Sequence, residues 1–192
     1  GYGAGPQPMN KLGRLRISAA VGYLAPARIR GNLHIRPDTT VRRLLFEGRR
    51  CTGAEVQPSH LPDGDTVSHV SARLVILCAG ALMSPTILLR SGVGATGQLA
   101  QLGVDTLKDA PGVGQNLSDH PALGVICEVR DPSLIDFDRP IIQTILRYTA
   151  EGSDKRNDLQ IEQISFAGRP GGLPLFMLAP VLEYQFGRGE LT

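Results

Sequence analysis

The chain has 192 residues, of which 42% are hydrophobic and 20% are charged, and its formal net charge is +2. This composition is typical of a globular chain and excludes an intrinsically disordered one. The near-neutral charge and the 5% of aromatic residues argue against a nucleic-acid surface, which needs a basic patch or stacking rings. No apolar run approaches the roughly 20 residues of a membrane span, and no signal peptide is visible.

The cysteines indicate the cellular compartment, and the first residues indicate whether the chain is part of a longer protein. Cys51, Cys78 and Cys127 are widely spaced, without metal-ligand spacing, so we expect free thiols, with Cys78 buried in an apolar strand. This usage fits a reducing compartment, and we expect a cytoplasmic protein. The chain does not begin with Met and opens on the loop-like run GYGAGPQP, so we expect a piece of a longer protein.

The first part of the chain is predicted to pass from loop to a small antiparallel meander. Gly and Pro make residues 1–14 an irregular loop. Ser18 can cap a short helix over residues 19–24, which Pro26 would stop. Strands are then predicted at 33–35, 39–47, 51–56 and 66–73, with a hairpin between the second and third and a turn at 58–65.

An apolar run, LVILCA at residues 74–79, is the strongest strand signal. Six consecutive apolar residues predict a fully buried strand that needs cover on both faces, as in a parallel layer packed under helices. Ser84 then stands where an N-cap belongs and Pro85 at the first helical position, so we expect a helix to start there. Gly92 should end that helix in a left-handed conformation.

The rest of the chain is predicted to alternate short elements and loops. In order, we expect a short helix at 98–102 ended by Gly103, a strand at 104–107, a loop at 109–121, a strand at 125–129, a helix at 140–150, a polar turn at 152–157, and strands at 159–166 and 176–185 around a turn at 168–172.

A literal GxGxxG pattern occurs from Gly92 to Gly97. Such a pattern binds a dinucleotide when a strand precedes it and a helix follows, because the phosphate must meet a helix N-terminus. Here a helix precedes it, so we expect these glycines to end one helix and turn into the next. Gly112 and Gly114 have the same limitation.

The corner after the apolar run, Ala79–Gly80, is more informative. A strand that ends in small residues lets a flat ligand approach the backbone, and in doubly wound folds ligands collect outside the carboxyl ends of strands. Alternatively, Gly80 only relieves a sharp turn before the helix. The residues alone leave both interpretations open.

Three segments resemble the glucose–methanol–choline (GMC) oxidoreductase family, and more narrowly its choline dehydrogenase-like members. GALMSPTILLRSGVG, residues 80–94, resembles the second signature of the family at every position, and GVGQNLSDHP, residues 112–121, resembles the loop that follows it. Residues 13–48 look like the segment before and within the strand meander. Residues 122–192 resemble the substrate-binding domain more loosely.

The resemblance implies an α/β fold: part of an FAD-binding doubly wound domain with a β-meander, residues 1–121, joined to part of an antiparallel-sheet substrate domain, residues 122–192. It implies a flavoprotein that uses FAD to oxidise a small-molecule alcohol, with hydride passing to the flavin and a His acting as base. Oxygen or a redox carrier would accept the electrons. No nucleic acid and no membrane span are expected.

Two parts of the family pattern are missing from this sequence. The family holds the FAD pyrophosphate on an N-terminal strand–GxGxxG–helix unit, and its catalytic His lies near the C-terminus beside a His or Asn. No GxGxxG here follows a strand, and no His follows His120. We therefore expect an interior piece that carries no catalytic residue and is inactive alone. An FAD-containing hydroxynitrile lyase on the same scaffold, or a non-catalytic remnant, stay as alternatives.

The resemblance also assigns cofactor-side residues. Val41 matches a valine whose backbone contacts the adenine of FAD, and Ala79 and Gly80 lie where the strand end meets the flavin nucleotide. Ser84 suits either a cofactor hydrogen bond or a helix cap.

Further candidates lie in the loop at 109–121 and beyond. Asn116 and His120 are cofactor-side candidates, whereas an adjacent Asp119–His120 pair also suits a turn. Glu162 and Glu183 alternate with apolar neighbours and would face solvent or a cleft, and Arg188 would bind a carboxylate or close a turn.

Overall fold

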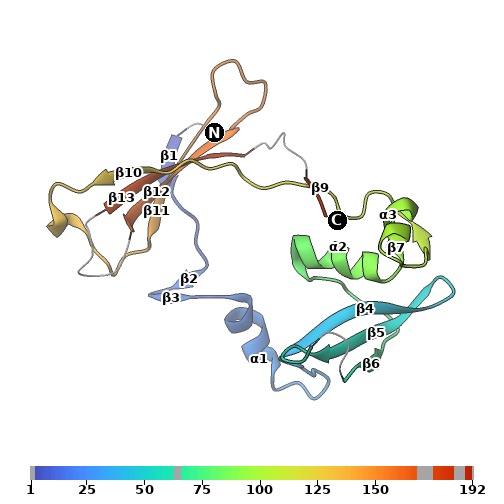
Figure 1. Cartoon of the computed structure of the whole chain (residues 1–192). Coiled ribbons are helices and arrows are strands. Elements are labelled where there is room, and N and C mark those ends of the chain that lie inside the picture. Colours follow the sequence, from blue (N-terminus) through green and yellow to red (C-terminus); the bar gives the residue numbers. More distant parts are fainter. Residues whose placement is uncertain (1–2, 63–65, 168–174, 184–188, 192) are drawn as a thin grey trace. The chain divides into compact units, whose positions relative to one another are not determined.

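The computed structural model describes residues 3–62, 66–167, 175–183 and 189–191 (Figure 1). The chain divides into two compact units, one of residues 1–33 with 119–186 and the other of residues 34–118 with 187–192. The boundary at 118/119 lies near the predicted division at residue 121, but residues 1–33 group with the later part of the chain. The functional division at 121 stays a prediction.

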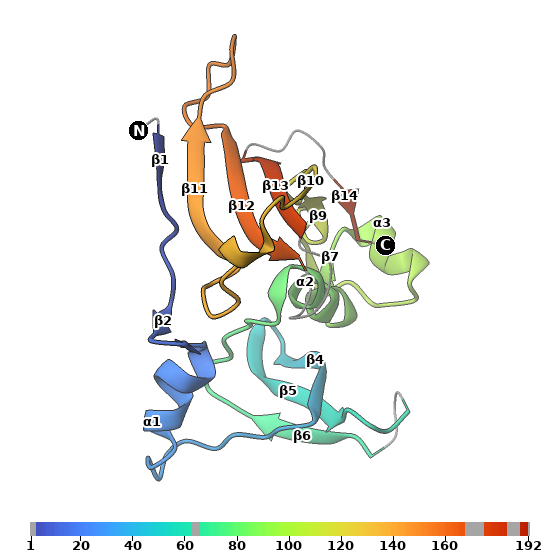
Figure 2. The ribbon, with the colours of Figure 1, turned by 90° about the vertical axis from the view of Figure 1, so that its left-hand side faces the viewer.

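The first unit is built on a five-stranded sheet, in which every neighbouring pair is antiparallel (Figure 2). The strand order is β1 (Gly3–Pro6), β11 (Ile142–Tyr148), β12 (Leu159–Ala167), β13 (Leu175–Leu182) and β10 (Val125–Glu128). β1 and β10 are the edges, so the sheet joins the first residues of the chain to segments more than a hundred positions later.

Short elements follow β1 in the same unit. A tight hairpin joins β2 (Lys11–Leu12) to β3 (Leu15–Arg16), and its turn needs Gly13, whose φ is +57°. A π-helical turn (Ala20–Leu24) then runs into α1 (Ala25–Ala27), and a 3-10 turn covers Pro132–Leu134. The Ser18 hydroxyl accepts the Val21 N–H at 3.3 Å, as a cap would, but Pro26 stands inside α1 and does not stop the helix.

The second unit contains a three-stranded antiparallel sheet in the order β4 (Thr39–Glu47), β5 (Arg50–Pro58) and β6 (Ser68–Ser71). Helix α2 (Gly80–Arg90) packs against β4 (Figure 1). The chain continues through β7 (Val93–Gly94), α3 (Thr96–Gln101), β8 (Lys108–Asp109), β9 (Gln115–Leu117) and β14 (Gly189–Glu190). The buried apolar side chains of the described residues, Val56, Ile87, Leu89 and Leu99, all belong to this unit.

Several predicted elements are confirmed. The hairpin of β4 and β5 has the predicted first strand, and Gly48 makes its turn with a φ of +57°. Gly92 and Gly103 end α2 and α3 with φ values of +79° and +68°. The strands β6, β10, β12 and β13 also fall within two or three residues of their predicted ranges, while the predicted turn at 168–172 lies outside the described residues.

The prediction of a buried strand at residues 74–79 is wrong. The segment forms no strand, Leu74 and Ile76 are 77% and 78% exposed, and the Cys78 thiol is free and exposed. A strand needs a neighbour for its backbone hydrogen bonds, and no described segment pairs with this one in a sheet. The apolar run is present in the sequence, but its expected burial is absent from the described structure.

The helix predicted at 140–150 is also wrong, because this segment forms β11 between β1 and β12. Its apolar residues fit a helical face, but Ile142, Ile145 and Tyr148 are of types that also favour strands. Backbone pairing with β1 on one side and β12 on the other makes this segment a strand. The same pairing makes residues 3–6 a strand within the predicted loop.

Two short predicted strands do not form, at 33–35 and at 104–107. The second prediction misplaces its element, because the strand β8 begins at Lys108 and pairs in parallel with β7. Helix α2 begins at Gly80, not at Ser84, and contains Pro85.

Candidate cofactor site

The corner at Ala79–Gly80 opens helix α2 and is exposed to solvent. Gly80 has a φ of +83°, a left-handed conformation that disfavours other residues. A Cβ atom placed on Gly80 would meet nothing within 4 Å. The backbone here is therefore bare and approachable, which is what a flat ligand lying against it requires.

The start of α2 carries its own polarity. The first N–H groups of a helix have no partner within the helix and bear partial positive charge, and α2 has no acidic residue in its first turn. The Ser84 hydroxyl accepts the backbone N–H of Ala79 at 3.0 Å. Ser84 thus ties down the residue before the helix, as a side chain of the first turns does in a capping box.

Val41 lies on β4, opposite Val56, and its side chain is half-buried. The register shifts between Val41 and Arg43, and β4 is the edge of its sheet. The hydroxyl of Ser91, which follows α2, accepts the Leu44 N–H at 2.8 Å. This bond joins the end of the helix to the strand that carries Val41.

Asn116 and His120 fall in different units. Asn116 lies on β9 with a φ of +61° and belongs to the unit of Val41, Ala79, Gly80 and Ser84. His120 belongs to the other unit, where its Nε2 is 3.7 Å from the Glu183 Oε2. The structure therefore places five of the six predicted cofactor residues in one compact unit.

The Glu183 carboxylate connects His120 to the five-stranded sheet. Its second oxygen, Oε1, is 3.7 Å from an Arg147 nitrogen, and Arg147 donates to the Gln160 side chain at 3.1 and 3.2 Å. Gln160 in turn donates to Glu162 at 2.8 Å. Asp119 accepts the backbone N–H of His120 at 2.7 Å, which is the predicted turn role. Arg188 lies outside the described residues.

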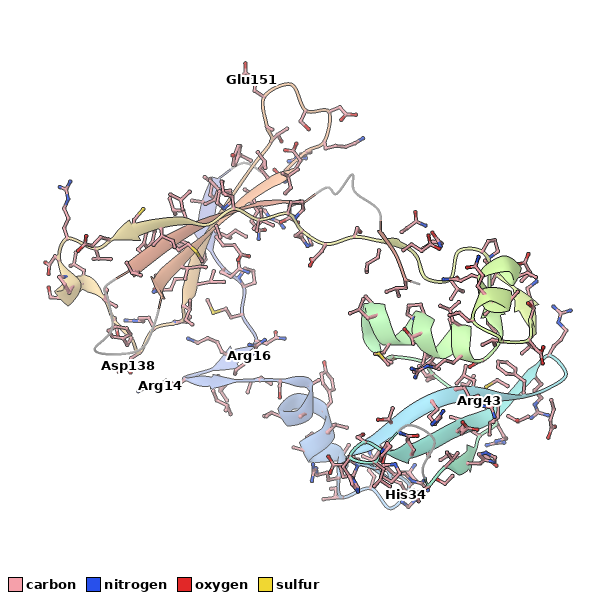
Figure 3. The ribbon with its side chains drawn as sticks, viewed as in Figure 1. Arg14, Arg16, His34, Arg43, Asp138 and Glu151 are labelled. Atoms are coloured by element: carbon pink, nitrogen blue, oxygen red, sulfur yellow. The ribbon has the colours of Figure 1, made fainter. Side chains whose placement is uncertain are left out.

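A charged cluster on the three-stranded sheet was missed by sequence reasoning. Glu55 is 8% exposed and accepts two hydrogen bonds from Arg43, at 2.9 and 3.1 Å (Figure 3 shows Arg43 on β4). These bonds, with the charges of Arg43, Arg42 and His69, hold the pKa of the Glu55 carboxyl below its usual value against the opposing effect of burial. The hairpin register pairs Arg43 with Glu55, and this pairing was the signal from which the cluster could have been found.

The GxGxxG pattern from Gly92 to Gly97 has the predicted structural role. Gly92 follows α2, Gly94 lies in β7 and Gly97 lies inside α3. A Cβ on Gly94 would collide with the Leu89 side chain, so this glycine serves close packing.

Among the described residues there is no group of three His, Cys, Asp or Glu side chains placed to hold a metal ion. No helix in the described part is long and apolar enough to cross a membrane.

Comparison with known proteins identifies the relatives of this chain. The sequence profile described as GMC oxidoreductase matches residues 3–122. An uncharacterized GMC-type oxidoreductase of Rhodococcus erythropolis is 40% identical over 80% of this chain and 32% of its own length. A 5-(hydroxymethyl)furfural oxidase of Methylovorus sp. is 42% identical over 68% of this chain and 24% of its own length.

An oxygen-dependent choline dehydrogenase of Burkholderia cenocepacia is 37% identical over 69% of this chain and 22% of its own length. The chain thus spans about a third or less of these curated relatives. Among solved structures, pyridoxine 4-oxidase from Mesorbium loti superposes with a TM-score of 0.83 and 27% identity, over 98% of this chain and 38% of that one. An FAD-dependent oxidoreductase from Chaetomium thermophilum gives 0.71 and 20%, over 93% of this chain and 41% of that one. These matches confirm the predicted fold class.

Proposed function

Because the chain belongs to the GMC oxidoreductase family, whose cofactor is FAD, we propose that it forms part of an enzyme that oxidises an alcohol. We propose further that residues 34–118 help to hold the flavin nucleotide. The observation that carries this proposal is the bare corner at Ala79–Gly80, which lies inside the segment that the family profile matches. The small-molecule alcohol and the electron acceptor, oxygen or a redox carrier, belong to the proposal as well.

The residues at the corner fit a cofactor held by main chain. Gly80 offers an unobstructed approach, the start of α2 offers N–H donors, and Ser84 fixes Ala79 in place. Val41 would contribute main-chain contact to the adenine from β4. Asn116 and His120 would stand on the cofactor side of their own units.

When bound, FAD accepts a hydride from the alcohol carbon that bears the hydroxyl group. The part proposed for the described residues is to bind and orient the nucleotide, since fixed geometry lowers the entropic part of the barrier. We assign no catalytic base among them. His120 faces Glu183 and Asp119, which is an arrangement that holds a loop.

The relatives favour oxidation over the alternative lyase reaction. Those named above whose names state a specific reaction are two oxidases and a dehydrogenase. The two reactions differ in an observable way, because oxidation of an alcohol reduces the flavin and cleavage of a cyanohydrin leaves it oxidised. Anaerobic addition of a primary alcohol to the complete protein should therefore bleach its yellow colour. A colourless product, or cyanohydrin cleavage without bleaching, would contradict the proposal.

The placement of the cofactor is tested by Gly80→Ala in the complete protein. An added methyl group in a close contact costs about 1–3 kcal/mol, so we expect FAD binding to weaken by about tenfold or more. The measurement is the visible flavin absorbance relative to protein absorbance after dialysis, with the FAD dissociation constant by titration.

Gly48→Ala is the matched control for backbone strain. Gly48 also has a positive φ, +57°, and nothing within 4 Å of its Cβ position, but it lies in the β4–β5 turn. Both variants incur the cost of placing an L-residue in the left-handed region, about 1–2 kcal/mol, and only Gly80→Ala should lose flavin. Equal flavin retention in the two variants would place the cofactor elsewhere.

A further inference from the structure

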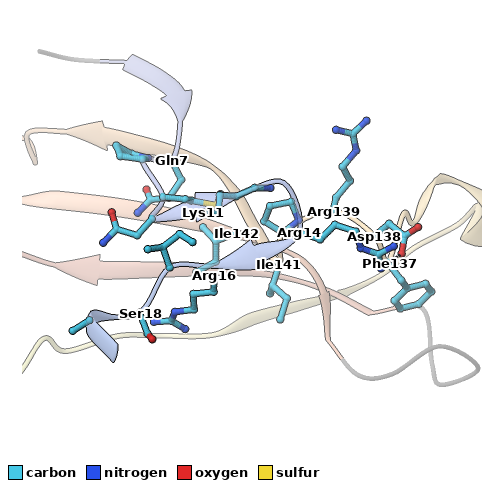
Figure 4. A pocket seen from close by; sticks show the side chains of 16 residues that line it. Gln7, Lys11, Arg14, Arg16, Ser18, Phe137, Asp138, Arg139, Ile141 and Ile142 are labelled. Atoms are coloured by element: carbon cyan, nitrogen blue, oxygen red, sulfur yellow. Dashed lines mark hydrogen bonds and ion pairs between the residues drawn. The ribbon is translucent and has the colours of Figure 1, made fainter. Parts of the chain in front are cut away.

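A large open cleft lies in the first unit, beside the β2–β3 hairpin (Figure 4). It has a volume of about 1030 Å³ and is lined by residues 7–11, 14 and 16–19 on one side and by residues 137–142 on the other. Pockets that take small molecules commonly have 300–1,000 Å³ or so. The cleft is therefore large enough for a small ligand, and none of the cofactor residues discussed above lines it.

The charge of the cleft is one-sided. Four cationic side chains line it, Lys11, Arg14, Arg16 and Arg139, against the single carboxylate of Asp138. Arg14 donates to Asp138 at 2.6 Å, and the Arg139 Nε is 3.2 Å from a carboxylate of Asp136, so two of the four are already paired. Lys11 and Arg16 have no carboxylate within ion-pair distance among the described residues.

The two cations without an ion pair occupy paired positions of the hairpin. Lys11 and Arg16 stand directly opposite in the β2–β3 hairpin, whose register is set by the turn at Gly13. Directly opposite residues of an antiparallel pair share a face, and like charges in this position repel and destabilise the pair. A bound anion would relieve this repulsion, and a carboxylate suits Arg16 especially well because it can accept two parallel hydrogen bonds.

The remaining wall of the cleft is apolar. Met9, Ile17, Pro140 and Ile141 line it, together with the ring of Phe137, and the last two are 52% and 39% exposed. Exposed apolar surface beside two unpaired cations suits a ligand with an apolar or aromatic body and a negative end. A quaternary ammonium group would be repelled from the same place.

We propose that this cleft binds a small organic carboxylate with an apolar or aromatic body, whose carboxylate is held by Arg16 while Lys11 adds positive charge to the same cleft. The apolar body packs against Phe137 and Ile141. The proposal rests on the charges and register of the hairpin and not on flavin chemistry, so it stands or falls independently of the proposed function.

Calorimetric titration of the complete protein with benzoate and with benzamide tests the charge requirement. The two probes have nearly the same shape, and only benzoate carries the carboxylate. We expect benzoate to bind at low ionic strength, to weaken as salt is added because exposed charges are screened, and to bind at least about fivefold more tightly than benzamide. Equal affinities for the two probes would overturn the proposal.

Variants place the binding in this cleft. Lys11→Gln and Arg16→Gln should each weaken benzoate binding by about threefold to fivefold, and the double variant by about tenfold or more. Arg156→Gln is the control, since Arg156 is an exposed cation of the same unit that does not line the cleft. Circular dichroism verifies that each variant is folded, and a folded double variant with unchanged benzoate affinity would refute the site.

A second experiment, on the kinetics of alcohol oxidation, tests whether the bound carboxylate is a substrate or an effector. para-Hydroxymethylbenzoate and para-hydroxymethylbenzamide are compared as alcohols, with and without benzoate. A lower KM for the acid, lost in the double variant, identifies the cleft as a substrate subsite. Benzoate binding that changes the kcat or KM of the amide, with no lower KM for the acid, identifies an effector site, and both outcomes support the binding proposal.

Discussion

The two largest sheets of the described residues are assembled from different kinds of contact. In the three-stranded sheet, β4 and β5 are consecutive and are joined by a turn at Gly48. In the five-stranded sheet, β1 pairs with β11, so that Gly3 stands opposite Arg147. The β4–β5 hairpin is specified by neighbours in the sequence. The β1–β11 pair of the five-stranded sheet must bring distant segments together, and closing that loop has an entropic cost. Local pattern therefore predicts the three-stranded sheet and the strands β10, β12 and β13, and it misses β1 and β11.

The largest predicted effect tests whether β11 is an interior strand of the five-stranded sheet. Ile145→Pro removes a backbone donor between β1 and β12 and should destabilise the first unit by on the order of 3 kcal/mol. Hydrogen exchange followed by mass spectrometry on the complete protein should show faster exchange in 142–148 and 159–167, but not in 39–58. Ile145→Ala, which keeps the ladder, should cost only about 1 kcal/mol. Equal effects of the two substitutions would argue against the ladder.

A smaller effect tests how much the local sheet gains from its charged cluster. Glu55→Gln should destabilise the second unit by about 2 kcal/mol at neutral pH, because the variant side chain loses the charged hydrogen bonds from Arg43. Glu47→Gln, at the exposed end of β4, is the control and should change the unfolding free energy by less than about 0.5 kcal/mol. Urea unfolding of the three proteins measures the difference.

The difference in unfolding free energy between wild type and Glu55→Gln should depend on pH with a definite sign. The pKa of Glu55 is lowered by its Arg43 hydrogen bonds, so its stabilising contribution is complete above the ordinary value of 4.5 and is lost as the pH falls through the lower folded value. The gap between wild type and Glu55→Gln should therefore narrow below pH 4.5. A gap that stays constant through this range would show that the charge is not the source.

The smallest effect concerns a long-range side-chain bond that ties the residue after α2 to the three-stranded sheet. Ser91→Ala removes the acceptor of the Leu44 N–H, a partly buried donor, and should cost about 1 kcal/mol. Ser118→Ala, an exposed serine of the same unit, should be close to neutral. If urea unfolding gives the same value for both, water replaces the Ser91 hydroxyl and the tie is dispensable.

The sequence could predict what short-range rules decide. Alternation over 39–47, a glycine turn and a glycine after each helix fix the β4–β5 hairpin and the ends of α2 and α3. The residues of β11 fit a helix and a strand equally, and only pairing with β1 and β12 distinguishes them. The start of α2 was misjudged because Ser84 and Pro85 mimic a helix start while lying inside the helix.

The candidate site was partly predictable for the same reason. Ala79, Gly80 and Ser84 are near one another in sequence. Gly80 and Ser84 lie in the family signature, and Ala79 directly precedes it. The basic cleft depends on a hairpin register, Lys11 against Arg16, and on a distant segment that supplies Asp138. No short-range pattern contains that combination.

The exposed run from Leu74 to Cys78 has a practical consequence for anyone who handles this chain in isolation. Five apolar residues without proline or charge are rich in β-formers and have no partner strand among the described residues. They resemble the segments that stack into cross-β fibrils. Concentrated preparations of the isolated chain should show thioflavin-positive self-association. A single Ile76→Lys gatekeeper should suppress it.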